Sequence, residues 1–467
     1  MRIDIPAGAR YIINELTGHG YEAYIVGGCV RDSLLGKKPN DWDITTSAMP
    51  MQVKKIFHRT VDTGIQHGTV TVLVDRKYSG NPENTPEQDG IQHTDYAYEV
   101  TTYRVDGKYE DHRRPKEVAF TVSLEEDLKR RDFTINAMAY NDAQGIIDIF
   151  GGQADLKSGV IRCVGSPAER FGEDALRILR AVRFAAQLGF KIDTDTRTAM
   201  REQGKFLRDI SAERIQVELT KLLVSEHPGM LVEAYELGLT RVFLPEFDRM
   251  MGTEQHNPYH KYTVGIHTVK VMEHVPGKMV LRYAALLHDV GKPDTKHTGD
   301  DGIDHFYGHQ KKSAEMARVI LRRLKLDNHT IDAVCNLVLN HDYGISGDGL
   351  GIKSFRRFLR GLGKDNFEDF ITLRKADMAG QSDYNLESRS RSVSEMERMY
   401  RVVVEEQQCL RISDLAIGGS DLIGLGMKPG RDIGNMLNML LERVLDEPEL
   451  NNREQLLQLA KSLTEHK

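Results

Sequence analysis

A glycine pair, an arginine and two aspartates follow one another in the segment IVGGCVRDSLLGKKPNDWDI. Gly27 and Gly28 close an apolar run that reads as a strand, and a short helix is expected to start there. Glycines allow a phosphate to approach the main chain closely, and the first turn of a helix offers free N–H groups to it. Arg31 lies three residues into that helix, within reach of the same anion. The segment therefore predicts a phosphate cradle.

Asp41 and Asp43 follow the cradle as a D-x-D pair. If DWDI is a strand, residues two apart point to the same side of it. Two carboxylates beside a phosphate site suit Mg²⁺. Metals held there would activate an attacking hydroxyl and neutralise a leaving pyrophosphate. We therefore predict a catalytic Mg²⁺ site at Asp41 and Asp43.

Asp174 and Arg177 stand three residues apart in EDALRILR, and we expect them to share one helical face. An aspartate acceptor beside an arginine donor forms an edge that can pair with a base. Cytosine and adenine both present an amine donor beside a ring-nitrogen acceptor, whereas guanine and uracil do not. The pair predicts selection of C and A without a template. Arg180 can reach the triphosphate of such a nucleotide, and Arg183 is a weaker candidate that faces RNA or another helix.

Histidines and aspartates of a second kind occur after residue 260. His288 and Asp289 are adjacent in YAALLHDVGK, a sequence that resembles the HD phosphohydrolase superfamily. Imidazole and carboxylate ligands together suit Mg²⁺ or a transition metal that activates water. The predicted ligand set for one or two metals is His267, His288, Asp289, His309, His341 and Asp377. The competing interpretation is a helical bundle that kept its histidines for packing.

The elements that must position these residues change character along the chain. The first part contains strand-like runs rich in Val, Ile, Thr and Tyr, which are YEAYIVGG, DWDI, GTVTVLV, YEVTTYR and IIDIFGG. The polar segment 79–95 reads as a long loop between two of them. After Gly152, apolar residues recur at spacings of three and four, which is typical of amphipathic helices. The segment 381–395 is Ser/Arg-rich and reads as a linker or a helix start.

These patterns predict an α+β fold in which a small mixed-sheet head precedes an all-α remainder. We expect a mixed-sheet head at 1–152, a helical neck and body at 153–259, an HD domain at 260–380 and a helical tail at 381–467. The expected length of a domain, about 150 residues, suits a division of 467 residues into several domains.

The segment GGCVRDSLLGKKPNDWDI resembles the signature of the class II tRNA nucleotidyltransferase and bacterial poly(A) polymerase family, within the polymerase-β-like nucleotidyltransferases. Three further segments resemble later motifs of that family in the same order. They are EEDLKRRDFTINAMAYN, RFGEDALRILRAVRFAAQLGF and SAERIQVELTKLL.

The resemblance implies roles for particular residues. Gly28 and Arg31 would contact the triphosphate, Asp41 and Asp43 would hold the metals, Arg131 would contact the incoming nucleotide, and Asp132 would order its loop. It implies that the head at 1–152 is a nucleotidyltransferase and that the neck and body at 153–259 select the nucleotide and bind RNA. It also implies tRNA, CTP and ATP as substrates. The segment 109–120, YEDHRRPKEVAF, resembles the family's flexible loop, which is associated with A addition and so favours a complete CCA-adding or an A-adding enzyme. The HD resemblance implies phosphatase or 2′,3′-cyclic phosphodiesterase activity.

Three functions stay open on the sequence alone. The first is complete CCA addition, the second is A addition or poly(A) synthesis by the same head, and the third is an HD phosphohydrolase with a regulatory nucleotide-binding head. An assay of CTP incorporation into tRNA that lacks CCA separates the first two. Intact Asp41, Asp43, Asp174 and Arg177 count against the third.

Composition limits the cellular setting. Apolar residues make up 40% of the chain, and no run of about 18 of them occurs, so we expect no membrane span. The start of the chain lacks the apolar core of a signal peptide. The four cysteines are far apart, which fits a reducing cytoplasm. The net charge of −6 does not suggest a nucleic-acid binder, but the segments 177–221 and 353–375 each carry four excess positive charges. We expect no stable protein partner.

Overall fold

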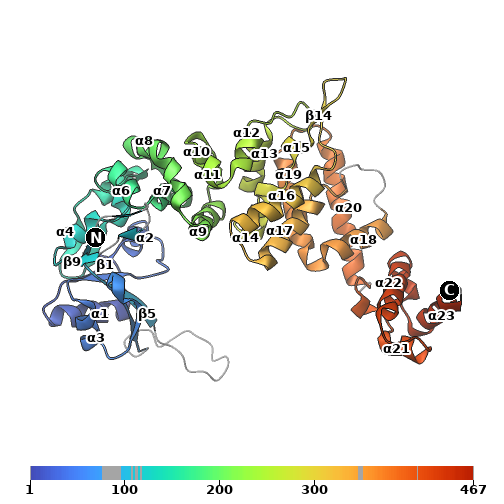
Figure 1. Cartoon of the computed structure of the whole chain (residues 1–467), viewed down its shortest axis with the longest axis horizontal. Coiled ribbons are helices and arrows are strands. Elements are labelled where there is room, and N and C mark those ends of the chain that lie inside the picture. The colour runs from blue at the N-terminus through green and yellow to red at the C-terminus, as the bar shows by residue number, and fades with distance from the viewer. Residues whose placement is uncertain are drawn as a thin grey trace. The chain divides into compact units, whose positions relative to one another are not determined.

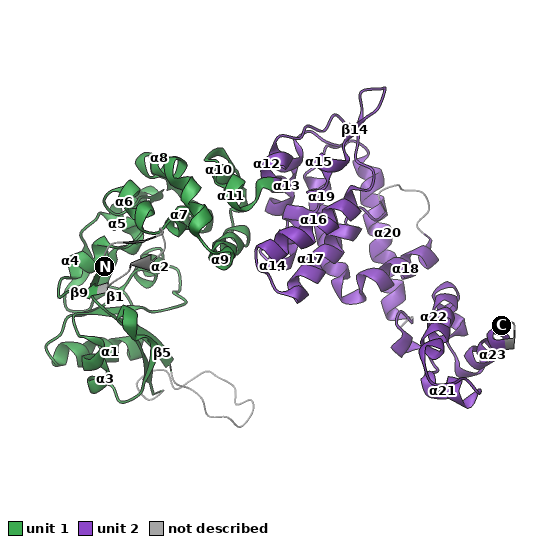
Figure 2. Cartoon of the chain, viewed as in Figure 1, with its two compact units in different colours: residues 1–245 green, residues 246–467 purple. Residues whose placement is uncertain are grey.

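The computed structural model describes residues 2–75, 96–106, 109–110, 114–115, 118–344, 351–406 and 409–465. The chain forms two compact units, Met1–Pro245 and Glu246–Lys467 (Figure 2). The four-part division expected from the sequence stays a prediction. The segment 79–95 and part of the segment 109–120 lie outside the described residues.

A seven-stranded sheet forms the first half of unit 1, in the order β11-β10-β1-β2-β5-β4-β3 (Figure 1). All neighbouring strands are antiparallel except β2 and β5, which are parallel. The predicted mixed sheet is therefore confirmed. Its strands are β1 (Ala23–Val26), β2 (Ile44–Thr46), β3 (Thr60–Gly64), β4 (Thr69–Val74), β5 (Tyr96–Thr102), β10 (Met138–Asn141) and β11 (Gly145–Asp148).

The central strands can be buried because their side chains are apolar, as in β1, or have their hydroxyl groups hydrogen-bonded, as in β2. All four residues of β1 are buried, and Thr45 and Thr46 of β2 are buried with their hydroxyls bonded within the head. Helix α1 packs on β1 and β2, and α3 packs on β4 and β5. The helices of the head are α1 (Ala7–Gly18), α2 (Gly28–Leu34), α3 (Pro50–Ile56) and α4 (Leu124–Lys129).

Short strands pair outside the main sheet. They are β6 (Arg104–Asp106) with β9 (Val118–Phe120), β7 (Tyr109–Glu110) with β8 (Arg114–Pro115), β12 (Val160–Ile161) with β13 (Lys191–Ile192), and β14 (His297–Thr298) with β15 (Asp304–His305).

The second half of unit 1 is helical. Helix α7 packs along α9 and carries an almost continuous buried face, so it forms the core of this half. The helices are α5 (Gly152–Ser158), α6 (Pro167–Glu173), α7 (Leu176–Leu188), α8 (Thr194–Gln203), α9 (Ala212–Leu223), α10 (Leu231–Glu236), α11 (Thr240–Phe243) and α12 (Pro245–Met251), the last of which begins at the unit boundary.

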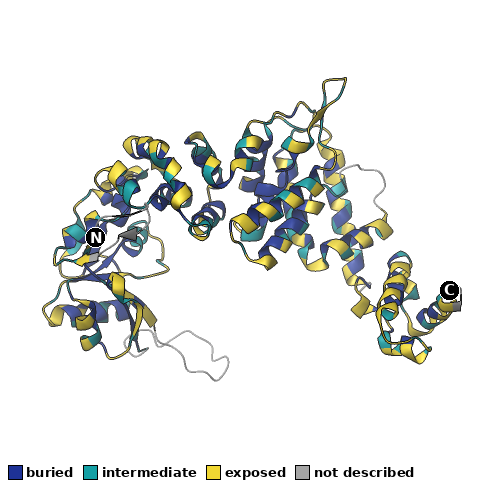
Figure 3. Ribbon diagram, in the orientation of Figure 1, coloured by how far each residue is buried: buried dark blue, intermediate teal, exposed yellow. Residues whose placement is uncertain are grey.

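Unit 2 contains a bundle of helices whose inner faces are buried (Figure 3). Within the bundle, α16 packs on α17, α13 on α14 and α19, and α14 on α17. The helices are α13 (Val264–His274), α14 (Met279–Leu287), α15 (Lys292–Thr295), α16 (His309–Arg323), α17 (Asn328–Asn340), α18 (Ile352–Leu362), α19 (Phe367–Ala379), α20 (Leu386–Glu405), α21 (Gly419–Gly424), α22 (Arg431–Asp446) and α23 (Arg453–Glu465).

Several local expectations are settled by these bounds. Most of the segment 381–395 belongs to α20, so it starts a helix and is not a linker. The positive excess of 353–375 does not form a free basic face, because most of its cations are paired or buried. Arg357 contacts Asp446, Arg374 contacts Asp377, Lys375 contacts Glu397, and Arg356 donates to the Leu445 carbonyl. Among the described residues, no helix is long and apolar enough to cross a membrane.

Candidate active site and metal centre

One cleft in unit 1 gathers every head residue that the sequence singled out. Its volume is about 550 Å³, and it lies between the end of β1, the segment before β2, the loop after α4 and the start of α7. The predicted residues that line it are Gly28, Arg31, Asp41, Asp43, Arg131, Asp132, Asp174, Arg177, Arg180 and Arg183. Residues as far apart in the sequence as 28 and 183 thus share one solvent-filled space.

The glycine pair shapes one wall of the cleft. Gly27 has φ +81°, a left-handed conformation that favours glycine, and it immediately precedes α2. A Cβ atom at this position would lie 3.1 Å from Nη1 of Arg131. The glycine therefore leaves room for the Arg131 guanidinium beside the start of α2.

Asp41 and Asp43 lie in the extended segment before β2, so the prediction that they belong to a strand is wrong. The strand begins only at Ile44, because Asp43 pairs with β1 through a single bond, from the Val26 N–H to the Asp43 carbonyl at 3.0 Å. Both carboxylates still face the same cleft. Both are exposed, and among the described residues neither accepts a side-chain hydrogen bond or forms an ion pair.

These two carboxylates fit a divalent cation. Although Asp43 is accessible from the cleft, the protein atoms around its carboxylate displace water and raise its pKa. Arg131 opposes this rise, and the charges of Glu99 and Asp41 add to it. A cation between the carboxylates would relieve the repulsion of Asp41 and Asp43. Their oxygen donors match the preference of a hard cation such as Mg²⁺.

A hydrogen-bonded chain connects three cationic and acidic groups of the cleft. Nη1 of Arg31 donates to Oδ1 of Asn136 at 2.7 Å, and Nδ2 of Asn136 donates to Oδ1 of Asp132 at 3.1 Å. Nε of Arg180 donates to Oδ2 of Asp132 at 2.8 Å. Burial alone would raise the pKa of Asp132, but Arg180 and Asn136 outweigh it and lower the pKa to about 2. The ionised Asp132 carboxylate therefore holds Arg180 directly and Arg31 through Asn136.

Asp127 is a residue that the sequence analysis missed. Its carboxylate is fully buried and accepts from Nε and Nη2 of Arg130 at 3.0 and 2.7 Å, and from Nη2 of Arg131 at 3.2 Å. It also accepts from Oγ1 of Thr45 on β2 at 3.1 Å. Its spacing of three and four residues from the two arginines on a helix was the available signal.

Asp174 and Arg177 do not share a helical face, so that prediction is wrong. Asp174 lies in extended conformation between α6 and α7, and its Oδ1 accepts from the Leu176 N–H at 3.1 Å. Its Oδ2 pairs with Arg214 of α9 at 2.7 Å. Arg177 instead donates to Glu173 at 2.6 Å and to the Arg130 carbonyl at 2.8 Å. The two side chains meet only as neighbours lining one cleft.

Arg183 ties two helices together. Its side chain is 8% exposed, its Nε donates to Oε2 of Glu218 at 2.7 Å, and its guanidinium lies 3.6 Å from the centre of the Phe184 ring. Burial lowers the pKa of Arg183 to about 10, against the opposing effect of Glu218. Arg183 faces α9, one of the two alternatives expected from the sequence. Glu218 and Arg214 belong to the segment SAERIQVELTKLL, in which no single residue had been singled out.

We expect Glu218→Gln to lower the free energy of unfolding of unit 1 by about 3 kcal/mol, because it leaves the buried Arg183 guanidinium without an anionic partner. Urea denaturation followed by the fluorescence of Trp42, the single tryptophan of the chain, measures the change. Glu202→Gln, at an exposed position of α8, is the matched control. A loss below 1 kcal/mol would show that the pair does not stabilise the fold.

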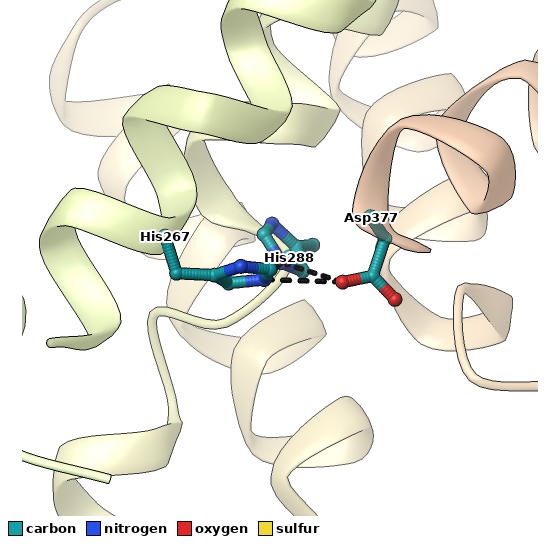
Figure 4. A group of neighbouring side chains, drawn as sticks. All are labelled: His267, His288 and Asp377. Atoms are coloured by element: carbon teal, nitrogen blue, oxygen red, sulfur yellow. Dashed lines mark hydrogen bonds and ion pairs between the residues drawn. The ribbon is translucent and has the colours of Figure 1, made fainter. Parts of the chain in front are cut away.

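Unit 2 contains a cluster of all six residues predicted as its metal ligands. They form two groups, His267 with His288 and Asp377, and Asp289 with His309 and His341. In each group the possible ligand atoms lie within 4.8 Å of one another, and every member is buried. Figure 4 shows the first group, in which both imidazoles face the Asp377 carboxylate.

Asp289 lies between the two groups. Its Oδ2 is 3.2 Å from Nε2 of His288 and 3.6 Å from Nε2 of His267. Its Oδ1 is 3.4 Å from Nε2 of His309 and 3.6 Å from Nε2 of His341. One carboxylate thus offers one oxygen to each group, which is the arrangement of a bridging ligand.

Main-chain carbonyls fix the orientation of all four imidazoles. The Nδ1 atoms of His267, His288, His309 and His341 lie 3.1, 2.8, 2.8 and 2.7 Å from the carbonyl oxygens of Gly380, Ala285, Phe306 and Val338. A carbonyl can only accept, so each neutral ring carries its proton on Nδ1 and turns an Nε2 lone pair inward. Such outer contacts are typical of metal-ligating histidines.

The inward atoms fit divalent cations. Nε2 of His267 and Nε2 of His288 are 3.3 Å apart, and so are those of His309 and His341, which places lone pair against lone pair. Oδ1 of Asp289 is buried and, among the described residues, accepts no hydrogen bond. Cations in these two positions would satisfy all of these acceptors.

A further carboxylate next to the cluster escaped the sequence analysis. Oδ2 of Asp342 lies 3.0 Å from Nε2 of His309, and Oδ1 lies 3.5 Å from Nε2 of His341. Burial would raise the pKa of Asp342, but His341 and His309 lower it below its usual value. The signal was present in the sequence, because His341 and Asp342 repeat the His-Asp pair of 288–289.

A cavity of about 270 Å³ opens onto the cluster. Its wall contains Asp289, His309, His341 and Asp377 together with the cations Lys292, Arg374 and Arg389. Nζ of Lys292 lies 2.8 Å from Oδ2 of Asp289. An anionic group entering this cavity would meet cationic side chains and the inward ligand atoms together.

Three family models match the chain in order. "Poly A polymerase head domain" matches residues 23–162, "Probable RNA and SrmB- binding site of polymerase A" matches 189–251, and "HD domain" matches 259–391. A curated CCA-adding enzyme of Leuconostoc mesenteroides subsp. mesenteroides is 33% identical over 460 residues, which are 97% of this chain and 95% of that protein. The chain belongs to the CCA-adding enzyme family.

Relatives of higher identity match a shorter stretch of the chain. The CCA-adding enzyme of Lactiplantibacillus plantarum is 50% identical over 220 residues, which are 47% of this chain and 49% of that protein. The chain thus spans about half the length of such relatives at this level of identity. A solved structure titled as the Bacillus stearothermophilus CCA-adding enzyme in complex with CTP is 28% identical, with a TM-score of 0.69, and covers 99% of this chain and 100% of that one.

Proposed function

We propose that the chain is a CCA-adding tRNA nucleotidyltransferase, which adds C, C and A to tRNA 3′ ends from CTP and ATP. The observation that carries this proposal is the single cleft in which unpaired Asp41 and Asp43 lie beside Arg31, Arg131 and Asp174. Membership of the CCA-adding enzyme family supports the choice of substrates, and the relative crystallised with CTP has the same fold.

In the proposed reaction the terminal 3′-oxygen of the RNA attacks the α-phosphorus of the nucleotide in line. A new phosphodiester bond forms, the α–β phosphoanhydride bond breaks, pyrophosphate leaves, and the hydroxyl proton passes to solvent. Arg31 and Arg131 bind the triphosphate, and Arg180, held by Asp132, keeps its guanidinium beside it. A divalent cation held by Asp41 and Asp43, which we propose is Mg²⁺, would supply charge neutralisation and lower the pKa of the hydroxyl.

Incubation of the purified chain with tRNA that ends before CCA, with labelled CTP or ATP, tests this function. Incorporation of both C residues followed by A supports complete CCA addition. Incorporation of A alone, or of a long A tail, would replace it with the A-adding or poly(A) alternative. No incorporation of either nucleotide would favour a regulatory head.

We expect Asp174→Ala to relax base choice more than it weakens triphosphate binding. Asp174 lines the cleft, and its loss removes the acceptor that we propose reads an exocyclic amine. The ratio of kcat/KM for CTP over UTP should fall about tenfold or more. Asp195→Ala, on α8, is the control. An unchanged ratio would place base selection elsewhere.

We further propose that the cluster in unit 2 is a metal-dependent phosphohydrolase site. The two groups of ligands joined by Asp289, and the cationic cavity above them, support this proposal. Four imidazoles favour a transition metal over Mg²⁺. A cation there would supply a bound water with a pKa near ~7, and Lys292 and Arg389 would bind the phosphoryl group. We place both activities in the cytoplasm, in keeping with four buried free thiols.

A further inference from the structure

A second groove lies on the head, next to the D-x-D segment. Its volume is about 890 Å³, within the usual range for ligand sites, and it runs between the start of the chain and residues 36–42. Three aromatic side chains, Trp42, Tyr96 and Tyr98, contribute to its lining. Tyr96 is 50% exposed and Trp42 is partly exposed, so both rings are accessible for stacking.

Trp42 is central to this groove because of where it stands in the sequence. It is the residue between Asp41 and Asp43, in an extended segment in which neighbouring side chains alternate. The two aspartates line the nucleotidyl-transfer cleft, whereas Trp42 lines the groove and not the cleft. One short segment therefore serves two surfaces.

Charge adds a second property to the groove. Its lining contains Arg2, Arg10, Lys37 and Lys38 against a single carboxylate, that of Asp4. Arg10 pairs with Asp142 at 2.8 Å. Within the described part of the chain, Lys37 and Lys38 have no carboxylate within 4.0 Å. Free cations beside accessible aromatic rings are the combination that binds single-stranded nucleic acid.

The two lysines also connect the groove to the reaction cleft. Gly36, with φ +69°, ends the turn after α2, and Lys37 and Lys38 follow it directly at the edge of the groove. Both line a neighbouring space of about 600 Å³ that contains Arg31, Asp41 and Asp43 as well. A polyanion that leaves the cleft along this wall meets the lysines first and the aromatic rings next.

We propose that this groove binds unpaired nucleotides of RNA, with bases stacked on Trp42 and Tyr96 and phosphates held by Lys37 and Lys38. The choice of RNA as the polymer rests on the proposed function. A duplex cannot offer its base faces to the two rings, because they are stacked inside it. An apolar peptide would offer no anionic group to Lys37 and Lys38.

Trp42 is the only tryptophan of the chain, so its emission reports on this groove directly. The test is titration of the whole protein with a single-stranded uridine hexamer, followed by Trp42 emission and, with a labelled hexamer, by anisotropy. Uridine is chosen because uracil lacks the donor–acceptor order that the proposed base site reads, so its bases should not bind there. The titration measures binding alone and needs no turnover. We expect saturable quenching of Trp42, at hexamer concentrations that match the anisotropy curve.

Two variants and one control locate the binding. Tyr96→Ala and Lys38→Glu should each raise the Kd for the hexamer about fivefold or more, in proportion to the loss of a stacked base or a phosphate contact. Lys55→Glu, an exposed change of the same charge on α3, should alter it less than twofold. Equal melting temperatures of the variants exclude unfolding as the cause.

Four outcomes would overturn the proposal. They are the absence of hexamer binding, hexamer binding without a change in Trp42 emission, an unchanged Kd in Tyr96→Ala, and equal binding and quenching by a base-free chain of six phosphates. If the protein binds the hexamer as expected but adds no nucleotide to tRNA, the proposed role of the groove is supported and the proposed function is overturned. Nucleotide addition without hexamer binding would overturn the groove alone.

Discussion

Replacement of Asp43 by Ala should abolish nucleotide addition, with a fall in kcat of about 1,000-fold or more, while the fold stays intact. Asp41→Ala should do the same. Neither carboxylate bonds to another described side chain, so neither contributes a contact to the fold. Their loss removes the ligands of the cation that stabilises the transferring phosphoryl group, an effect of several kcal/mol. Labelled CTP incorporation into tRNA that lacks CCA measures the fall.

The matched control is Asp62→Asn, an exposed aspartate of the same sheet that pairs with Lys54 on the surface. It should keep the parental rate, because a surface pair of this kind contributes little. Thermal unfolding followed by circular dichroism should show the same transition for all three variants. Addition at near the parental rate by Asp43→Ala would refute the assignment of the metal site.

Replacement of Asp289 by Ala should abolish metal binding by unit 2 and leave CCA addition unchanged. Asp289 offers one oxygen to each group of ligands, so its loss weakens both positions at once. The parental protein should bind two divalent cations per chain at this cluster, and the variant fewer than one. Metal analysis after dialysis measures the content, with Mg²⁺, Mn²⁺, Co²⁺ and Ni²⁺ each supplied. Hydrolysis of a 2′,3′-cyclic nucleotide and of a phosphomonoester measures activity.

His288→Ala should give the same pattern with a smaller effect, because His288 belongs to one group only. His329→Ala is the control, since His329 is exposed at the start of α17 and belongs to neither group. A parental protein that binds no metal would refute the centre and leave packing as the role of its histidines. A variant that loses metal together with CCA addition would show that the activities are not separate.

Residue type and order were sufficient to predict which side chains gather in the cleft and in the cluster of unit 2, because both sets lie in short motifs. The D-x-D pair after a glycine turn, and the histidines beside aspartates on apolar helices, could be recognised without knowledge of the fold. Their roles as metal ligands stay predictions. The mixed sheet and the helical remainder also follow from residue patterns, since β1 is apolar throughout and the apolar residues of α7 recur at spacings of three and four.

The errors have one local cause and two long-range causes. Asp174 was expected inside a helix, but aspartate is a strong helix-starting residue, and here its carboxylate caps the N–H of Leu176. Glu218 and Arg214 are partners of α7 residues that only the packing of α9 against α7 reveals. The positive excess of 353–375 suggested a basic surface, whereas α22 supplies acids to it from residues 442–446.

Asp127 connects the segment that carries the proposed cation ligands to the arginines beside the proposed triphosphate site. Its carboxylate holds Thr45, two residues after Asp43, and also holds Arg130 and Arg131. The proposed cation site and the proposed triphosphate-binding arginines are thus tied to one carboxylate, which fixes the distance between them. In the proposed change from CTP to ATP, the larger base would have to be accommodated by the wall that contains Asp174 and Arg177. When ATP replaces CTP, we therefore expect the rate of amide hydrogen exchange to change least at Thr45 and Arg131 and most at the start of α7.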